Sequence, residues 1–100
     1  MELLSDQEQK ALKRYERATV ALAGFRLLEF SALASNKLIG HIETSFSGKT
    51  LTTKDHIFLR LLAERKARNY RKLTDVRETI ELFSRMQRAA FEGIGLGGGV

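Results

Sequence analysis

The residues of this chain best suited to contact a charged partner are the cations between positions 60 and 72. The run holds six cations and one carboxylate, Glu64, so its net charge is +5, which equals the net charge of the whole 100-residue chain. Basic side chains around an aromatic ring are typical of nucleic-acid-binding surfaces, whereas the simpler interpretation is a solvated helix face. We predict a contact with a partner or with nucleic acid at Arg60, Arg65, Lys66, Arg68, Tyr70, Arg71 and Lys72.

Two short motifs resemble nucleotide-binding loops but lack the required context. Residues 47–50, Ser-Gly-Lys-Thr, match the end of a P-loop, yet Glu43 stands where the full motif needs glycine. The glycines of segment 93–99 resemble a dinucleotide fingerprint, which requires a strand before it and a helix after it. We therefore expect no cofactor.

The chain offers few residues for metal or acid-base chemistry. There is no cysteine, and His41 and His56 are the only histidines. A metal site needs three or four converging ligands, and a catalytic base needs an orienting group. Neither arrangement is recognisable from the spacing, so we predict no metal site, no catalytic residues and no enzymatic activity.

Long helices must position these residues, because the chain contains no proline to stop them. Ser5 with Glu8 has the form of a capping box, and helical apolar spacing continues from there to about residue 36. Thr52 or Thr53 with Asp55 forms a second cap, which starts a helical pattern that reaches about residue 91. Between the two helices, Gly40, Gly48 and several Ser and Thr residues predict a loop over residues 36–51, with one helical turn near residues 38–42.

The second helical pattern leaves two arrangements open. In an unbroken helix, Arg65, Arg68 and Lys72 lie in line with the apolar stripe of Val76, Ile80 and Phe83. Unpaired burial of such charges is costly, so either the helix breaks near residues 70–74, or the cations meet acids or phosphates on a partner. The three-four spacing after Leu73 suits packing against another helix but is too short to establish a coiled coil.

The predicted fold class is therefore all-α, with two long helices or three helices in one domain of residues 1–92. Five glycines in residues 93–100 predict a flexible tail. The first ten residues do not resemble a secretory signal, so we expect a cytoplasmic protein. Arg26 and Glu29 interrupt the most apolar stretch, Ala18 to Ser35, and for that reason we expect no membrane span.

The apolar residues exceed what two or three helices can hide from water. Residues 18–33 and 57–63 carry large apolar side chains on several sides of each helix. The leading hypothesis is a non-enzymatic helical interaction protein, either an adaptor, a regulator or a small subunit, that binds a protein partner or itself. The alternative is a nucleic-acid-binding module with little sequence specificity. We predict an apolar interface at Phe25, Leu28, Phe30, Phe58, Leu61, Val76, Ile80 and Phe83.

Overall fold

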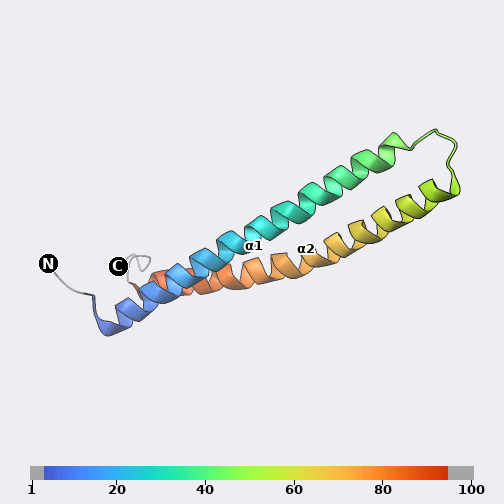
Figure 1. Ribbon diagram of the computed structural model, residues 1–100. Helices are drawn as coiled ribbons and strands as arrows, with labels where there is room; N and C mark the ends of the chain where they lie inside the picture. Colours follow the sequence, from blue (N-terminus) through green and yellow to red (C-terminus); the bar gives the residue numbers. More distant parts are fainter. Residues whose placement is uncertain (1–3, 95–100) are drawn as a thin grey trace. The chain divides into compact units, whose positions relative to one another are not determined.

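A computed structural model describes residues 4–94, and within them all regular structure is helical. Helix α1 spans Asp6–Ser45 and helix α2 spans Thr53–Gly93, with a loop of residues 46–52 between them (Figure 1). The predicted all-α fold with two long helices is confirmed. The helix of residues 53–93 is unbroken near positions 70–74, so the three-helix alternative is wrong.

Both predicted capping boxes start the helices. At α1, the Glu8 amide donates to Ser5 Oγ at 3.1 Å, and the Ser5 amide donates to Glu8 Oε1 at 3.3 Å. At α2, the Asp55 amide donates to Thr52 Oγ1 at 3.2 Å, and the Thr52 amide donates to Asp55 Oδ2 at 2.9 Å. Each box satisfies two backbone donors that the first helical turn leaves unpaired. The cap of α2 is therefore Thr52 rather than Thr53.

The predicted start of the loop at residue 36 is wrong, because α1 continues to Ser45. Gly40 lies inside the helix, where Thr44 Oγ1 donates to its carbonyl oxygen at 2.9 Å. The helix ends at Ser45, and the following loop turns at Gly48, whose φ of 75° lies in the left-handed region that glycine adopts without strain. Asn36 does not cap a helix end, since its side chain contacts α2.

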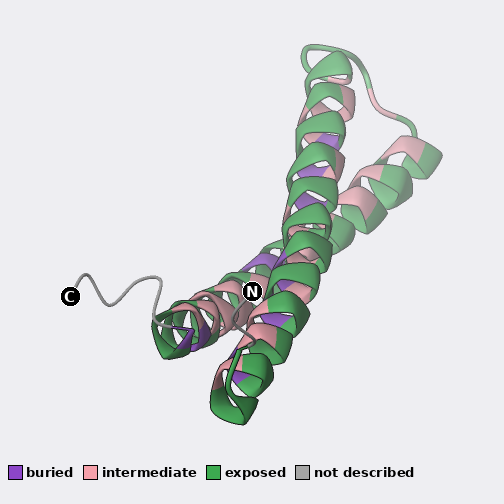
Figure 2. Cartoon of the chain, turned by 90° about the vertical axis from the view of Figure 1, so that its left-hand side faces the viewer, coloured by how far each residue is buried: buried purple, intermediate pink, exposed green. Residues whose placement is uncertain are grey.

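Within each of the two compact units described below, α1 and α2 face each other along one stripe of each helix, which we call the seam. Seam positions recur at alternating three- and four-residue steps from Glu8 to Phe46 and from Asp55 to Ile94, and every one is buried or half-buried. This spacing is typical of coiled coils. In Figure 2 the buried residues follow one stripe of each helix, and most of the remaining surface is exposed.

The chain divides into two compact units, which are described separately. The hairpin unit, residues 28–76, contains the loop and the halves of α1 and α2 next to it. Its seam combines apolar residues with polar side chains that bond across the two helices. The seam residues of this unit are Glu29, Ala32, Asn36, Ile39, Glu43, Phe46, Asp55, Leu59, Leu62, Lys66, Asn69, Leu73 and Val76.

The terminal unit, described for residues 4–27 and 77–94, pairs the start of α1 with the end of α2. Its seam includes Ala11, Ala18 and Ala90, and the Cβ of Ala11 would lie 3.2 Å from a Cβ placed on Gly93. Two ring pairs and a hydrogen bond from Gln87 Nε2 to Thr19 Oγ1, at 2.8 Å, join the helices. The predicted flexible tail, residues 93–100, lies outside the described residues from position 95 onward.

Candidate partner-binding surfaces

Four of the eight residues predicted for an apolar interface lie in the seam within the chain itself. The Phe25 and Phe83 rings pack against each other in the terminal unit, with centroids 5.4 Å apart. Ile80 is half-buried in the same unit, and Val76 is half-buried in the hairpin unit. The internal helix pair therefore already uses the apolar surface of these four side chains.

The other four predicted interface residues are exposed. Leu28 and Phe30 on α1, together with Phe58 and Leu61 on α2, are large apolar side chains of the hairpin unit that remain in contact with solvent. Phe58 also contacts the Phe46 ring across the loop, at a centroid distance of 6.0 Å. These side chains, unlike the seam residues, are available to a partner.

Lys66 differs from the other cations of segment 60–72. It occupies the seam, where its Nζ atom lies 3.1 Å from Glu43 Oε1 in a half-buried ion pair. Next to it, Asn69 Nδ2 donates to Asn36 Oδ1 at 2.8 Å and to Ser35 Oγ at 3.1 Å. The seam of the unbroken helix thus passes through Lys66 and Asn69 rather than through Arg65, Arg68 and Lys72.

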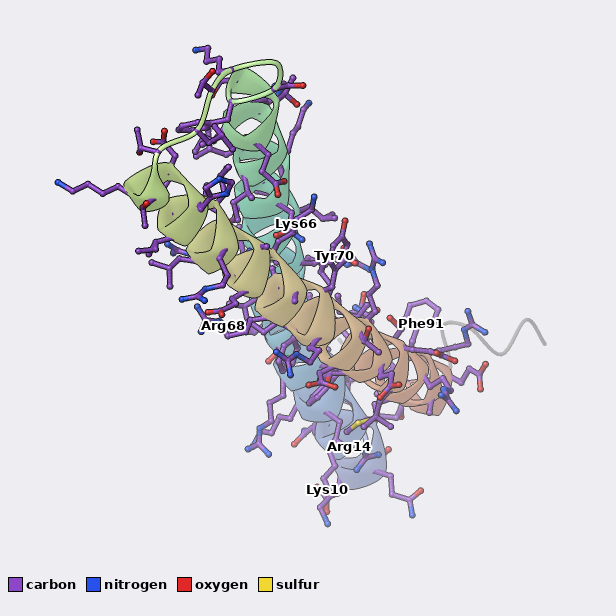
Figure 3. All side chains as sticks on the ribbon, turned by 90° about the vertical axis from the view of Figure 1, so that its right-hand side faces the viewer. Lys10, Arg14, Lys66, Arg68, Tyr70 and Phe91 are labelled. Carbon is purple, nitrogen blue, oxygen red and sulfur yellow. The ribbon has the colours of Figure 1, made fainter. Side chains whose placement is uncertain are left out.

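The remaining five cations of the segment are exposed. None of them forms an ion pair or a side-chain hydrogen bond with another residue of the described range 4–94. Figure 3 shows Arg68 on one side of α2, with Lys66 and Tyr70 on the other. Positive charge is therefore free to contact a partner at Arg60, Arg65, Arg68, Arg71 and Lys72.

A groove in the hairpin unit brings two of these cations together with residues of α1. Its volume is about 280 Å³. One wall is the α2 row of Arg65, Asn69, Lys72 and Val76, and the other is an α1 row of smaller side chains. The lining residues from α1 are Leu28, Ser31, Ala32 and Ser35.

The α1 wall of this groove was not predicted from the sequence. Ser31, Ala32 and Ser35 carry no distinctive motif, and their role is visible only once the facing side of α2 is known. A signal was present in the three-four spacing of Ala32, Asn36 and Ile39, which would have placed the seam and hence its flanks.

The residues considered for metal or acid-base chemistry do not form a cluster. His41 and His56 are both exposed, the first on α1 and the second in the first turns of α2. Within residues 4–94, no group of three or more His, Cys, Asp or Glu side chains could hold a metal ion. The groove, by contrast, brings polar side chains from both helices together.

Comparisons with protein-family models, with characterised proteins and with solved structures gave no match to this chain.

Proposed function

We propose that this chain is a non-enzymatic helical interaction protein, acting as an adaptor, a regulator or a small subunit of a larger assembly. The observation that carries the proposal is the side of α1 that points away from the seam. We call it the outer face of α1. It consists of Val20, Ala23 and Leu27 in the terminal unit and of Phe30, Ala34 and Leu38 in the hairpin unit.

The outer face is apolar and exposed to solvent. The exposed fractions are 73% for Val20, 69% for Leu27, 70% for Phe30 and 61% for Leu38. Between Ala18 and Asn36, Arg26 and Glu29 are the charged residues, and neither belongs to this face. Contiguous exposed apolar surface of this kind marks sites of association, since its burial gains about 25 cal/mol per Å².

A protein surface is the occupant we favour for the outer face. The small residues Ala23 and Ala34 lie on either side of Leu27 and Phe30, so ridges of another helix have grooves to enter. By length and composition α1 also qualifies as a membrane span, with 17% of its most apolar 18-residue window buried. Core helices of soluble proteins pass the same test but are mostly buried, and association through the outer face would bury α1 in that way. A lipid surface is the contrary outcome to be measured.

Light scattering of the purified chain tests the proposal. We expect a dimer or larger species, or aggregation that a partner relieves, because the outer face exposes too much apolar surface in a monomer. The Leu27→Lys/Leu38→Lys variant should shift the chain toward monomer. The matched control, Leu82→Lys/Met86→Lys, adds the same charge at exposed apolar positions of α2 and should leave the assembly intact.

Two results would contradict this proposal. The first is a monodisperse wild-type monomer at high concentration. The second is flotation of the wild-type chain with neutral lipid vesicles that is lost in Leu27→Lys/Leu38→Lys, since that result would assign the outer face to lipid.

The unpaired cations support a second candidate function, nucleic-acid binding. If Arg65, Arg68, Arg71 and Lys72 contact phosphates, four contacts predict a slope of about −3 to −4 for log affinity against log salt. Replacing all four by Gln, a good helix former, should remove most of that slope while helicity is kept. If the chain does not bind DNA or RNA in physiological salt, the nucleic-acid function is contradicted and only the protein-partner function remains.

A further inference from the structure

The groove of the hairpin unit carries two cations that are free to bind an anionic group. Arg65 and Lys72 line it from α2, and neither is paired with a carboxylate among residues 4–94. Lys66, by contrast, is already paired with Glu43 at 3.1 Å. An unpaired cation at the rim of a groove retains its full charge for a ligand.

The two groove cations are two helical turns apart on the same side of α2. Seven residues separate Arg65 from Lys72, which corresponds to about 10 Å along the axis and to nearly the same direction around it. A partner helix lying in the groove matches this spacing when it carries carboxylates at positions i and i+7. The groove therefore favours a ligand with two negative charges about 10 Å apart.

The α1 wall allows a helix to approach closely. Ser31, Ala32 and Ser35 are small, and Ser35 is held by the Asn69 amide at 3.1 Å. Asn69 itself is fixed by the buried Asn36 at 2.8 Å. Small side chains on the α1 wall leave room for the backbone of a third helix. Because hydrogen bonds hold Ser35 and Asn69 in place, the surface that this helix contacts is preorganised.

Apolar side chains stand near both ends of the cation pair. Leu28 lines the groove and is 56% exposed, with Val76 beside it in the lining. Leu61 is 54% exposed and lies one turn before Arg65 on the same side of α2. A ligand that uses this surface fully is therefore apolar at both ends and acidic between them.

We propose that the groove binds an acidic amphipathic helix of a partner protein, with two carboxylates seven residues apart that pair with Arg65 and Lys72. This inference rests on the proposed interaction function and names the partner's chemistry at a surface separate from the outer face of α1. The directions of the other cations favour a helix over nucleic acid. Arg68 lies about 60° from Arg65 around the helix, but Arg60 and Arg71 lie about 140° and 120° away, so the five exposed cations do not form one phosphate track.

The test uses two synthetic helical peptides with identical composition. Both carry Leu residues near their ends, one has its two Glu residues at i and i+7, and the other has them at i and i+5, about 140° apart. Titration calorimetry on the full chain should show about 2- to 5-fold tighter binding of the i,i+7 peptide, the ratio expected when it makes one ion pair more than the i,i+5 peptide.

Variants of the protein locate the binding site. Arg65→Gln/Lys72→Gln should lose most of the affinity for the i,i+7 peptide and the preference for it. Arg60→Gln/Arg71→Gln is the matched control, because it removes the same two charges from exposed, unpaired positions outside the groove and should keep the affinity within about twofold, as expected for screened charges. Circular dichroism checks that both variants stay helical.

Several outcomes would overturn the inference. Equal binding of the two peptides, or equal losses in the two double variants, would show attraction between net charges without a site. An oligonucleotide that competes with the i,i+7 peptide and binds more tightly would assign the cations to nucleic acid. The proposed association through α1 is tested separately, since Leu27→Lys/Leu38→Lys changes the oligomeric state and should leave peptide affinity unchanged.

Discussion

Asn36 and Asn69 face each other in the hairpin unit at positions where coiled coils usually hold leucine. A polar pair of this kind costs stability relative to an apolar one, and its hydrogen bonds are best satisfied in a single register. The 2.8 Å bond between the two side-chain amides is the shortest hydrogen bond described across the seam of the hairpin unit. At the scale of single residues, the pair fixes which positions of α2 face the groove.

Exchanging one or both of these amides separates register from stability. Asn36→Leu alone should lower the free energy of unfolding by about 1–3 kcal/mol, because it leaves the half-buried Asn69 amide short of an acceptor. Asn36→Leu/Asn69→Leu should recover that loss, since both polar groups are then replaced. Urea denaturation followed by circular dichroism measures both variants, and additive losses in the double variant would contradict the pairing.

Alanine substitutions at Gly40 and Gly48 should change stability in opposite directions. Gly40 lies within α1 with open space around its Cβ position, so Gly40→Ala should raise stability by about 0.5–1 kcal/mol. Gly48 adopts a φ of 75°, so Gly48→Ala should lower stability by about 1–2 kcal/mol. Thermal unfolding of the two variants should therefore shift in opposite directions, and a loss of stability in Gly40→Ala would contradict the helix end at Ser45.

At the scale of the elements, each helix owes its start to a short polar motif and its pairing to the seam. The Thr52 cap predicts that Thr52→Ala lowers the free energy of unfolding by about 1 kcal/mol. Thr53→Ala is the matched control, because the Thr53 hydroxyl makes no hydrogen bond in the described part of the chain. Chemical denaturation compares the two variants, and equal effects would mean that the cap does not stabilise α2.

The sequence was sufficient to predict the two helices, because capping boxes and missing prolines are local signals. It was insufficient to place the end of α1. Gly40 and the hydroxyl residues after it resemble a loop locally, but Ile39 and Glu43 continue the seam and keep the segment helical. Tertiary packing overrides local propensity there.

The cations of the candidate site could be predicted from the sequence, but the side of α2 on which each of them lies could not. All five free cations were identified, whereas the assignment of Arg65 and Lys72 to one groove required the phase of the seam. That phase is hidden because Lys66 and Asn69, polar residues, occupy seam positions. Hydrophobic periodicity alone shifts the apparent stripe toward Arg65 and Lys72.

At the scale of the whole molecule, the two proposed surfaces differ in chemistry and should respond oppositely to salt. Adding ammonium sulfate should strengthen self-association through the apolar outer face of α1, because excluded salts favour burial of apolar surface. Sodium chloride should weaken binding of the i,i+7 peptide, because it screens exposed charges beyond about 8–10 Å at physiological strength. Light scattering and calorimetry over the same salt series measure both, and parallel responses would mean that one surface serves both contacts.

The sequence separation of paired residues also predicts the order in which contacts between the helices form during folding. Phe46 and Phe58 are 12 residues apart in the chain, Ser35 and Asn69 are 34 apart, and Thr19 and Gln87 are 68 apart. Because the entropy lost on closing a loop grows with its length, contacts beside the loop at Gly48 close first, and each closed layer shortens the next loop. We therefore expect helix pairing to begin beside the loop and to proceed outward. Substitutions near the loop should slow folding, whereas those near residues 15 and 91 should speed unfolding, and stopped-flow kinetics of both sets of variants measures this.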